Sequence, residues 1–288
     1  MKVDIVCPVY KEFEKVKALY QSLFLQKGID IASIVFPYTL SGNKELDQKF
    51  INFFNENNIK YFILNSDEFS HSLTREKAIK EFCQSKIVVM ISQDIKFINN
   101  DSIYQLCLSI ENQESVYNYG RQIGKKRTIE KYIREKNYPS VSRVVSKNDI
   151  PELQIMSFFS SDSFSAYNRD IFIKLNGYQG YDVMMNEDQL YSKIILDAGY
   201  KKKYCAEAIV EHSHKYTLKK LYQRYFQAGQ FYKKVKVFDQ YKKNESGFSL
   251  AFYVLKRAFM EFNIPVIIRW LPDMASRYLG LRKGQRED

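Results

Sequence analysis

The stretch KIVVMISQD, residues 86–94, decides the fold class of this chain. Every residue from Ile87 to Ile91 is apolar, so both faces of an extended strand would be buried there. Parallel strands that are covered by helices on both faces have this pattern. The run ends almost directly in a carboxylate, Asp94, at the carboxyl end of the predicted strand. In open parallel sheets, ligands bind beyond that end of the strands.

Strand-like and helix-like patterns alternate on the amino-terminal side of this stretch. Short apolar runs predict strands at 3–10, 33–38 and 61–64, and a helical apolar stripe follows each of them. A further helix is predicted after Asn100 or Asp101, either of which could cap it. These repeated units predict an α/β fold with a Rossmann-like, mostly parallel central sheet and helices on both faces.

The second half of the chain departs from this regular alternation. Residues 124–152 are charged and lack sustained periodicity, so we expect a long excursion or lid there rather than a core element. A strand is then predicted within 158–168, and a helix from Glu187 to Ala198 that Gly199 closes. A last strand is predicted at 203–214.

Composition and charge restrict the class of protein. The chain has 288 residues, of which 45% are hydrophobic, and its four scattered cysteines lack any CxxC spacing. This usage predicts reduced core thiols in a cytoplasmic protein. No secretory signal opens the chain, and no apolar stretch approaches the roughly 20 residues that span a bilayer. Residues 201–243 hold twelve Lys or Arg against three acids, which predicts attraction to phosphates, lipid headgroups or nucleic acid.

Two of the three histidines lie in VEHSH, residues 210–214. Side chains alternate along a strand, so six of them should share one face that is apolar until its end: Tyr204, Ala206, Ala208, Val210, His212 and His214. One or both rings would then meet Asp94 at the rim of the sheet, and imidazole with carboxylate suits Mn²⁺. The alternatives are a histidine pair on the surface and an ordinary turn aspartate.

Two acids, Glu187 and Asp188, stand side by side in NEDQL, residues 186–190, just before a helical apolar pattern. Carboxylates at a helix start are stabilised by the helix dipole, so a capping role is one interpretation. The other is a carboxylate that takes a proton from an attacking hydroxyl. Both roles are compatible, because one acid can steady the helix while the other faces a pocket.

Taken in this order, the motifs resemble those of inverting glycosyltransferases of family 2, which have the GT-A fold. The resemblance covers roughly residues 1–230. DIVCPVY (4–10) matches the family's first strand, which contacts the nucleotide, and SQD (92–94) matches its metal-binding motif. NED (186–188) matches the motif of the catalytic base, and HSH (212–214) matches a histidine near the end of the domain that binds the metal. Other stretches narrow the resemblance to bacterial rhamnosyltransferases, including FSHSLTREKAI (69–79), YGRQ (119–122) and HSHKYTLKKLYQRYFQAG (212–229).

The resemblance implies a role for each matching residue. Asp94 and His212 would bind Mn²⁺ or Mg²⁺, with His214 as a further ligand. Asp188 would be the general base, while Glu187 would hold or orient the acceptor hydroxyl. The acceptor would also contact Asp162. The nucleotide-sugar site would be lined by Pro8, Val9, Tyr10, Arg75, Gln93, Asp94, Arg121 and Gln122.

The resemblance also implies an activity. L-rhamnose would pass from dTDP-rhamnose to a hydroxyl of a cell-surface polysaccharide or of its polyprenyl-linked precursor, with inversion at the anomeric carbon. UDP- or GDP-linked sugars are alternative donors. Residues 1–123 would bind the donor and residues 124–230 the acceptor. Two departures concern nucleotide binding, because Ser92 replaces the usual first acid of the metal motif, and Tyr38 and Thr39 stand where the family carries an acidic pair.

Residues 231–288 are basic and aromatic, and we expect a helical appendage there. Phe248, Phe252, Leu255 and Phe259 recur at near-helical spacing, and Pro265 is expected to interrupt the next apolar run. Such a helix can lie on the inner face of the cell membrane. The alternative is packing on the catalytic domain or on a second subunit. A non-catalytic protein that binds membrane or nucleic acid is a further alternative, but no nucleic-acid-binding motif supports it.

Overall fold

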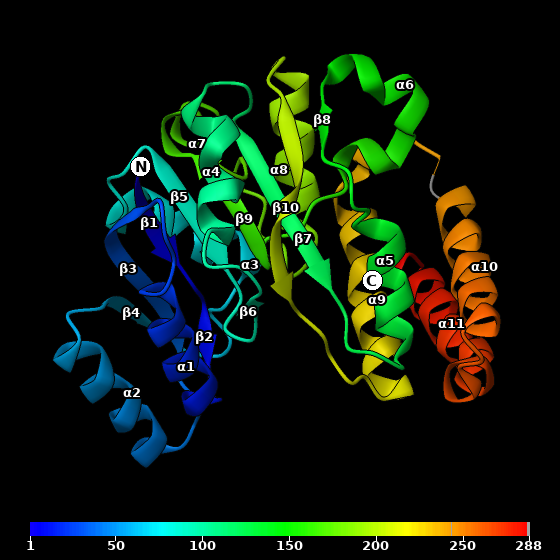
Figure 1. The fold of residues 1–288 in the computed structure, drawn as a ribbon, viewed down its shortest axis with the longest axis horizontal. Coiled ribbons are helices and arrows are strands. Elements are labelled where there is room, and N and C mark those ends of the chain that lie inside the picture. The colour runs from blue at the N-terminus through cyan, green and yellow to red at the C-terminus, as the bar shows by residue number, and fades with distance from the viewer. Residues whose placement is uncertain (243, 287–288) are drawn as a thin grey trace.

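The computed structural model describes residues 1–242 and 244–286. Within these residues a ten-stranded sheet has the order β2-β3-β1-β5-β9-β7-β10-β6, with β4 beside β3 and β8 beside β10. The strands are β1 Lys2–Val6, β2 Val9–Tyr10, β3 Asp30–Thr39, β4 Lys60–Leu64, β5 Ile87–Ile91, β6 Lys96–Phe97, β7 Tyr117–Ile123, β8 Arg143–Val145, β9 Phe164–Asn168 and β10 Lys202–Glu211. The N-terminal strands lie at one end of the molecule and the C-terminal helices at the other (Figure 1).

Helices cover both faces of this sheet. They are α1 Phe13–Leu23, α2 Lys44–Glu56, α3 His71–Lys77, α4 Ser102–Glu111, α5 Ile129–Asn137, α6 Ile150–Leu153, α7 Arg169–Lys174, α8 Glu187–Asp197, α9 Leu218–Lys234, α10 Asn244–Met260 and α11 Ile264–Gly284. A π-helical segment, η1 Ala78–Phe82, continues α3. The short 3-10 segments are η2 Lys147–Asp149, η3 Gln154–Phe158 and η4 Lys236–Phe238. The predicted α/β fold with a mostly parallel sheet and a helical C-terminal region is confirmed.

Strand β5 is buried along its whole length, and its side chains divide between two cores. Ile87, Val89 and Ile91 pack into the core under α1, α2 and α4. Val88 and Met90 point the other way, into the core under η1, α7 and α8. This division explains why the strand is apolar at every position. The four cysteines are free and buried, as predicted.

The direction of β9 decides which residues meet at the rim of the sheet. β5 pairs with β1 in parallel, and β10 pairs with β7 in parallel, but β9 runs antiparallel between β5 and β7. The amino end of β9 therefore lies at the same edge as the carboxyl ends of β1, β5, β7 and β10. Residues 161–163, which lead into β9, belong to that edge.

The segment 124–152 is more regular than its sequence predicts. Thr128 caps α5 by accepting a hydrogen bond from the backbone of Lys131, and β8 pairs with β10. Ile129, Tyr132 and Ile133 are buried against α10 and α11. The expectation of an excursion without a core element is therefore wrong. The missed signal is the i, i+3, i+4 spacing of these three side chains.

Strand β10 contains an irregularity that moves its side chains from one face to the other. Its pairing with β7 shifts between Cys205 and Ile209. Tyr204 packs in a small tyrosine-rich cluster, whereas Val210 belongs to the core under α4. The prediction of one continuous face from Tyr204 to His214 is therefore wrong on the amino-terminal side of this bulge. Inserted residues break the period of two on which that prediction relied.

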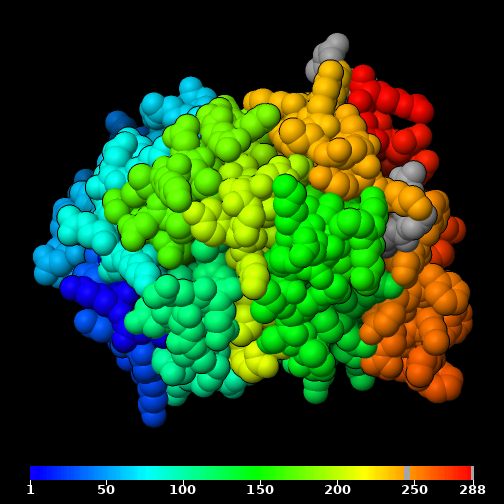
Figure 2. All heavy atoms as spheres, turned by 90° about the horizontal axis from the view of Figure 1, so that it is seen from above, coloured from blue at the N-terminus to red at the C-terminus, as the bar shows by residue number. Residues whose placement is uncertain are grey.

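The C-terminal helices pack closely on the rest of the chain, and the orange and red segments cover one end of the molecule in Figure 2. Helix α11 lies along α9, where an added Cβ atom on Gly280 or Gly284 would collide with the carbonyl oxygen of Tyr222 or Phe226. Arg277 of α11 also forms an ion pair with Glu130 of α5 at 2.7 Å. The expected boundary at residue 230 falls inside α9. Pro265 lies in the first turn of α11 and does not interrupt it.

Gly280→Ala is expected to destabilise the protein by about 1–3 kcal/mol, because the two helix backbones must separate to admit a methyl group. Gly247→Ala in α10 is the matched control, since nothing lies within 4 Å of an added Cβ atom there. It should be neutral or stabilise the helix by up to about 1 kcal/mol. Urea denaturation measures both free energies of unfolding. Equal values for the two variants would contradict the close packing of α9 and α11.

Candidate metal and carboxylate site

One edge of the sheet gathers the side chains that sequence analysis selected. Asp94 follows β5, while His212 and His214 follow β10. Nε2 of His212 lies 3.3 Å from one oxygen of Asp94, and Nδ1 of His214 lies 3.4 Å from the other. Among the described residues, these three side chains are the group that could hold a metal ion, with their ligand atoms within 4.8 Å of one another.

The charge and spacing of this group fit a divalent cation. Burial lowers the pKa of both histidines, that of His214 to about 4, so both rings are neutral near pH 7. Burial alone would raise the pKa of Asp94, but its contact with His212 and the positive charge that either ring carries when protonated lower it to about 2. One carboxylate and two imidazole lone pairs therefore converge. Neighbouring ligands around a six-coordinate ion with bonds of about 2.1 Å lie about 3 Å apart, close to the spacings seen here.

Strand β2 lies against the loop after β5. The side-chain amide of Gln93 donates to the carbonyl oxygen of Tyr10 and accepts from its backbone N–H, both at 2.9 Å. Val9 is buried, whereas Tyr10 is exposed and the ammonium group of Lys11 lies 4.7 Å from the centre of its ring. Gln93 thus ties the predicted nucleotide-contacting strand to the Asp94 loop. Contact of Pro8, Val9, Tyr10 and Gln93 with a nucleotide stays a prediction.

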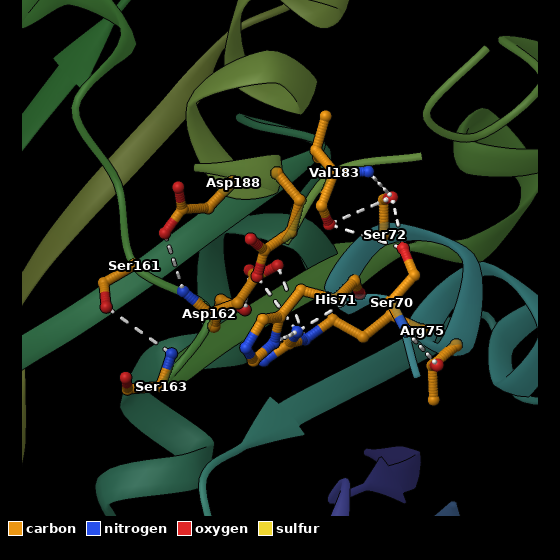
Figure 3. A network of polar contacts seen from close by, with 12 residues as sticks. Ser70, His71, Ser72, Arg75, Ser161, Asp162, Ser163, Val183 and Asp188 are labelled. Carbon is orange, nitrogen blue, oxygen red and sulfur yellow. Dashed lines mark hydrogen bonds and ion pairs between the residues drawn. The ribbon is translucent and has the colours of Figure 1, made fainter. Parts of the chain in front are cut away.

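The acids Glu187 and Asp188 begin helix α8, but they face different surroundings. Glu187 is buried and forms an ion pair with Arg75 at 3.0 Å. Asp188 stays partly exposed and accepts hydrogen bonds from the backbone N–H groups of Gln189 at 2.7 Å and Asp162 at 3.3 Å. Figure 3 shows the Asp188 carboxylate over the Asp162 backbone, with Arg75 and His71 below. Of the two acids, Asp188 is the one with an exposed surface.

Asp162 is a buried hub of hydrogen bonds. Its carboxylate accepts from the hydroxyls of Tyr117, Tyr167 and Ser165 at 2.6–2.9 Å, and the guanidinium of Arg75 lies 3.9 Å away. Arg75 in turn donates to Nδ1 of His71 at 2.6 Å. These contacts place both Asp162 and Arg75 beneath the base motif. Direct contact of Asp162 with an acceptor, or of Arg75 with a diphosphate, stays a prediction.

The surroundings of Asp188 make it a stronger base than an ordinary carboxylate. Burial raises its pKa well above the usual 3.8, and the negative charges of Glu187 and Asp162 raise it further. Its two backbone hydrogen bonds act in the opposite direction but do not cancel the rise. A carboxylate with a raised pKa holds an abstracted proton more firmly.

The turn before β9 joins the metal group to the base. The hydroxyl of Ser161 accepts a hydrogen bond from the Gln122 amide at 2.7 Å, and Gln122 contacts His212. The next residue, Asp162, donates its backbone N–H to Asp188, and the carbonyl of Ser163 accepts from the backbone of Ser92 at 3.0 Å. Three consecutive residues therefore link β5, β7 and α8 at one edge of the sheet.

Arg121 and Gln122 of the YGRQ motif lie on opposite faces of β7 and have different neighbours. Gln122 is buried beside His212, with 2.9 Å between its side-chain oxygen and Nδ1 of the ring. Arg121 is the adjacent strand residue and so lies on the opposite face of β7. Its charge acts on Tyr204, and its Nε atom is buried without a hydrogen bond. Their predicted contact with the donor stays untested.

Arg224 is a residue that the sequence analysis did not select. It lies on α9 and lines a cleft of about 750 Å³ together with Tyr216, Lys220 and Gln227. Its charge lowers the pKa of His71 as well as those of His212 and His214. The guanidinium therefore lies within electrostatic range of both the base motif and the metal group. The i, i+4 spacing of Lys220 and Arg224 after HSH was the available signal.

Two curated proteins are similar to this chain in sequence. The O-antigen chain rhamnosyltransferase RfbN of Salmonella typhimurium is 36% identical over 177 residues, which cover 61% of this chain and 56% of that protein. The O-antigen chain rhamnosyltransferase WbaN of Salmonella anatum is 37% identical over 179 residues, with the same coverage. The resemblance to rhamnosyltransferases is confirmed. The chain matches little more than half the length of these relatives, and no family model matches it.

Solved structures show the same fold. The mannosyltransferase PcManGT from Pyrobaculum calidifontis, in complex with GDP-Man and Mn²⁺, matches 98% of this chain and 86% of its own, with a TM-score of 0.64 and 11% identity. S. aureus TarS 1–349, in complex with UDP-GlcNAc, matches 100% of this chain and 93% of its own, with a TM-score of 0.55 and 12% identity. At these identities the likeness concerns the fold alone. The chain has the GT-A fold of glycosyltransferases.

Proposed function

We propose that this protein is an inverting, metal-dependent glycosyltransferase that moves L-rhamnose from dTDP-rhamnose to a hydroxyl of a cell-surface polysaccharide. The observation that carries the proposal is the turn 161–163, which connects an Asp–His–His group to a carboxylate of raised pKa. An inverting displacement needs these two groups on either side of the reacting carbon. One stabilises the leaving diphosphate, and the other removes the acceptor's proton.

The residues divide the chemistry between them. Asp94, His212 and His214 would hold Mn²⁺ or Mg²⁺, which when bound neutralises charge that develops on the departing diphosphate. Arg224 faces the same region and would add a fixed positive charge there. Asp188 would take the proton of the attacking hydroxyl, while the ion pair with Arg75 fixes Glu187 beside it. A single attack from the face opposite the diphosphate inverts the anomeric carbon.

The choice of donor rests on the rhamnosyltransferase relatives. Both are named O-antigen chain rhamnosyltransferases, which supports rhamnose as the sugar and an O-antigen-like glycan as the acceptor. A UDP- or GDP-linked sugar is the alternative donor, since the solved neighbours carry UDP-GlcNAc and GDP-Man. We expect the acceptor glycan to be attached to a polyprenyl lipid at the inner face of the cell membrane.

Release of nucleoside diphosphate from a panel of nucleotide sugars tests the proposal. Each donor is incubated with the full chain and Mn²⁺, Mg²⁺ or EDTA, and donor binding is measured by calorimetry in parallel. Binding and release with dTDP-rhamnose that disappear in EDTA would support it. Preference for another nucleotide sugar would overturn the rhamnose assignment alone. If no donor binds in the presence of metal, the transferase proposal is wrong.

We infer that the α10–α11 hairpin contacts an anionic membrane surface. None of the helices in the described ranges combines the length and apolarity of a membrane span. The hairpin packs on α5 through its buried side chains, but Phe252 is 69% exposed, Phe262 86% and Ile268 74%. Residues 231–288 contain twelve Lys or Arg against six acids. An apolar face with basic neighbours matches a surface of anionic lipids.

Replacing Phe252, Phe262 and Ile268 together by Ser is expected to weaken binding to vesicles about tenfold or more, since each side chain loses roughly 1.5–3 kcal/mol of burial. Vesicles of phosphatidylcholine with and without phosphatidylglycerol are sedimented with the protein. Phe24 and Leu25, which are exposed at the end of α1, supply the matched control in a double Ser variant. Loss of dimers in the triple variant without any change in vesicle binding would identify a second copy as the partner instead.

A further inference from the structure

A chain of buried hydrogen bonds ends on the metal-facing histidine. Nη1 of Arg134 donates to the side-chain oxygen of Gln122, and the same oxygen lies 2.9 Å from Nδ1 of His212. The amide nitrogen of Gln122 donates to Ser161 at 2.7 Å. Arg134, Gln122 and His212 are all at least 90% buried, so water does not compete for these contacts.

The hydrogen-bond donors and acceptors around His212 decide which of its two ring nitrogens carries the proton. A guanidinium only donates, so the atom of Gln122 that faces Arg134 must be its oxygen. That oxygen only accepts and lies 2.9 Å from Nδ1 of His212, while the Asp94 carboxylate, which also only accepts, lies 3.3 Å from Nε2. The two acceptors compete for the one proton of the neutral ring, and the shorter contact with Gln122 favours Nδ1, which leaves the lone pair of Nε2 free. Nη2 of Arg134 lies 3.4 Å from Nδ1 and could donate to it only in the opposite tautomer.

We propose that Arg134 and Gln122 form a positioning relay that fixes the ring orientation and tautomer of His212, so that its Nε2 lone pair is held ready for a divalent cation. The proposal rests on the proposed function for the identity of the ligand. Hydrogen-bond partners of this kind on the far nitrogen of a metal-bound histidine commonly change metal affinity by about 10–100-fold. Both residues act through His212 and need not touch the donor.

The relay also connects the metal group to the C-terminal helices. Arg134 lies on α5, and the buried side chains of α5 pack against α10 and α11. Glu130, one turn before Arg134, is held by Arg277 of α11. Arg134, within the segment 124–152, therefore holds its guanidinium in a fixed position next to His212. A segment that moved as a lid would not hold it there.

Nitrogen-15 NMR of the metal-free protein tests the relay directly. The chain has three histidines, and long-range ¹H–¹⁵N spectra at a pH where the rings are neutral distinguish the two tautomers of each. We expect His212 to carry its proton on Nδ1 in the wild type. Arg134→Met should produce a mixture of tautomers because the Gln122 amide becomes free to rotate, whereas Arg134→Lys should keep the wild-type form. Lys136→Met, on the same helix, is the control.

Binding of Mn²⁺ alone, followed by electron paramagnetic resonance, gives the second measurement. Gln122→Leu should raise the dissociation constant about 10–100-fold. Gln122→Glu should retain or strengthen binding, because a carboxylate also accepts from both Arg134 and His212. A proton on Nε2 in the wild type, or unchanged Mn²⁺ binding by Gln122→Leu, would overturn the relay. If the tautomer responds to Arg134→Met while the wild type binds no Mn²⁺, the relay stands and the metal-dependent function fails.

Discussion

Asp188→Asn is expected to lower kcat for sugar transfer by about 10²–10⁴-fold, which is the usual contribution of a positioned general base. Asparagine has the same shape and keeps the shorter hydrogen bond from the backbone N–H of Gln189, but its amide nitrogen then faces the N–H of Asp162, so only the longer of the two contacts is lost at the start of α8. It cannot take a proton from the acceptor. Affinities for Mn²⁺ and donor should therefore remain within about twofold of the wild type.

Asp170→Asn is the matched control for this variant. Asp170 is an exposed acid in the first turn of α7, so its replacement removes the same favourable interaction with a helix dipole. Single-turnover kinetics with a saturating donor separate chemistry from product release. Wild-type kcat in Asp188→Asn would exclude Asp188 as the base. Glu187 would not be a ready substitute, because Arg75 holds it in a buried ion pair.

The dependence of kcat/KM on pH should carry the signature of Asp188. Burial and the neighbouring charges of Glu187 and Asp162 raise its pKa, so it binds a proton at a pH where an ordinary carboxylate is still ionised. Only the ionised form can act as a base, so kcat/KM should fall as pH decreases through this raised pKa. In Asp188→Asn the residual activity should lose that acidic limb.

The regular part of the fold could be predicted because its physical causes are local. The all-apolar run of β5 is needed to fill two cores at once, and the stripes of α1, α2 and α4 recur with the helical period. The bulge of β10 has no such local signal, and the short apolar stripe of α5 is a weak one. A bulge changes which face a residue occupies without changing composition, and α5 is half covered by helices from the far end of the chain.

Prediction of the candidate site from the sequence has the same limit, because local patterns do not show contacts between distant segments. Asp94, His212 and His214 were expected together because parallel strands present their carboxyl ends at one edge, and the structure brings them together there. The partners of these groups follow from contacts between distant segments. Arg75 is 112 residues from Glu187 in the sequence, yet it forms the ion pair that keeps Glu187 away from the exposed surface. Sequence motifs locate such residues but do not say which neighbour they bind.

Asp94→Asn is expected to weaken Mn²⁺ binding about 100-fold or more and to remove metal-dependent turnover. Asp94 supplies the single negative charge of the group, and both histidines are neutral, so the amide would leave a divalent cation without a charged protein ligand. Asp101→Asn, at the start of α4, is the control. Mn²⁺ binding is followed by electron paramagnetic resonance and turnover by release of nucleoside diphosphate.

The dependence of Asp94→Asn on Mn²⁺ concentration separates two explanations of its defect. If Asp94 only holds the ion, millimolar Mn²⁺ should refill the site and restore most of kcat, because His212 and His214 keep their lone pairs directed at the same point. If kcat stays low in saturating Mn²⁺, Asp94 must also tune the charge presented to the leaving diphosphate. Turnover by Asp94→Asn that equals the wild type in EDTA and in Mn²⁺ would contradict a metal-dependent mechanism at this edge of the sheet.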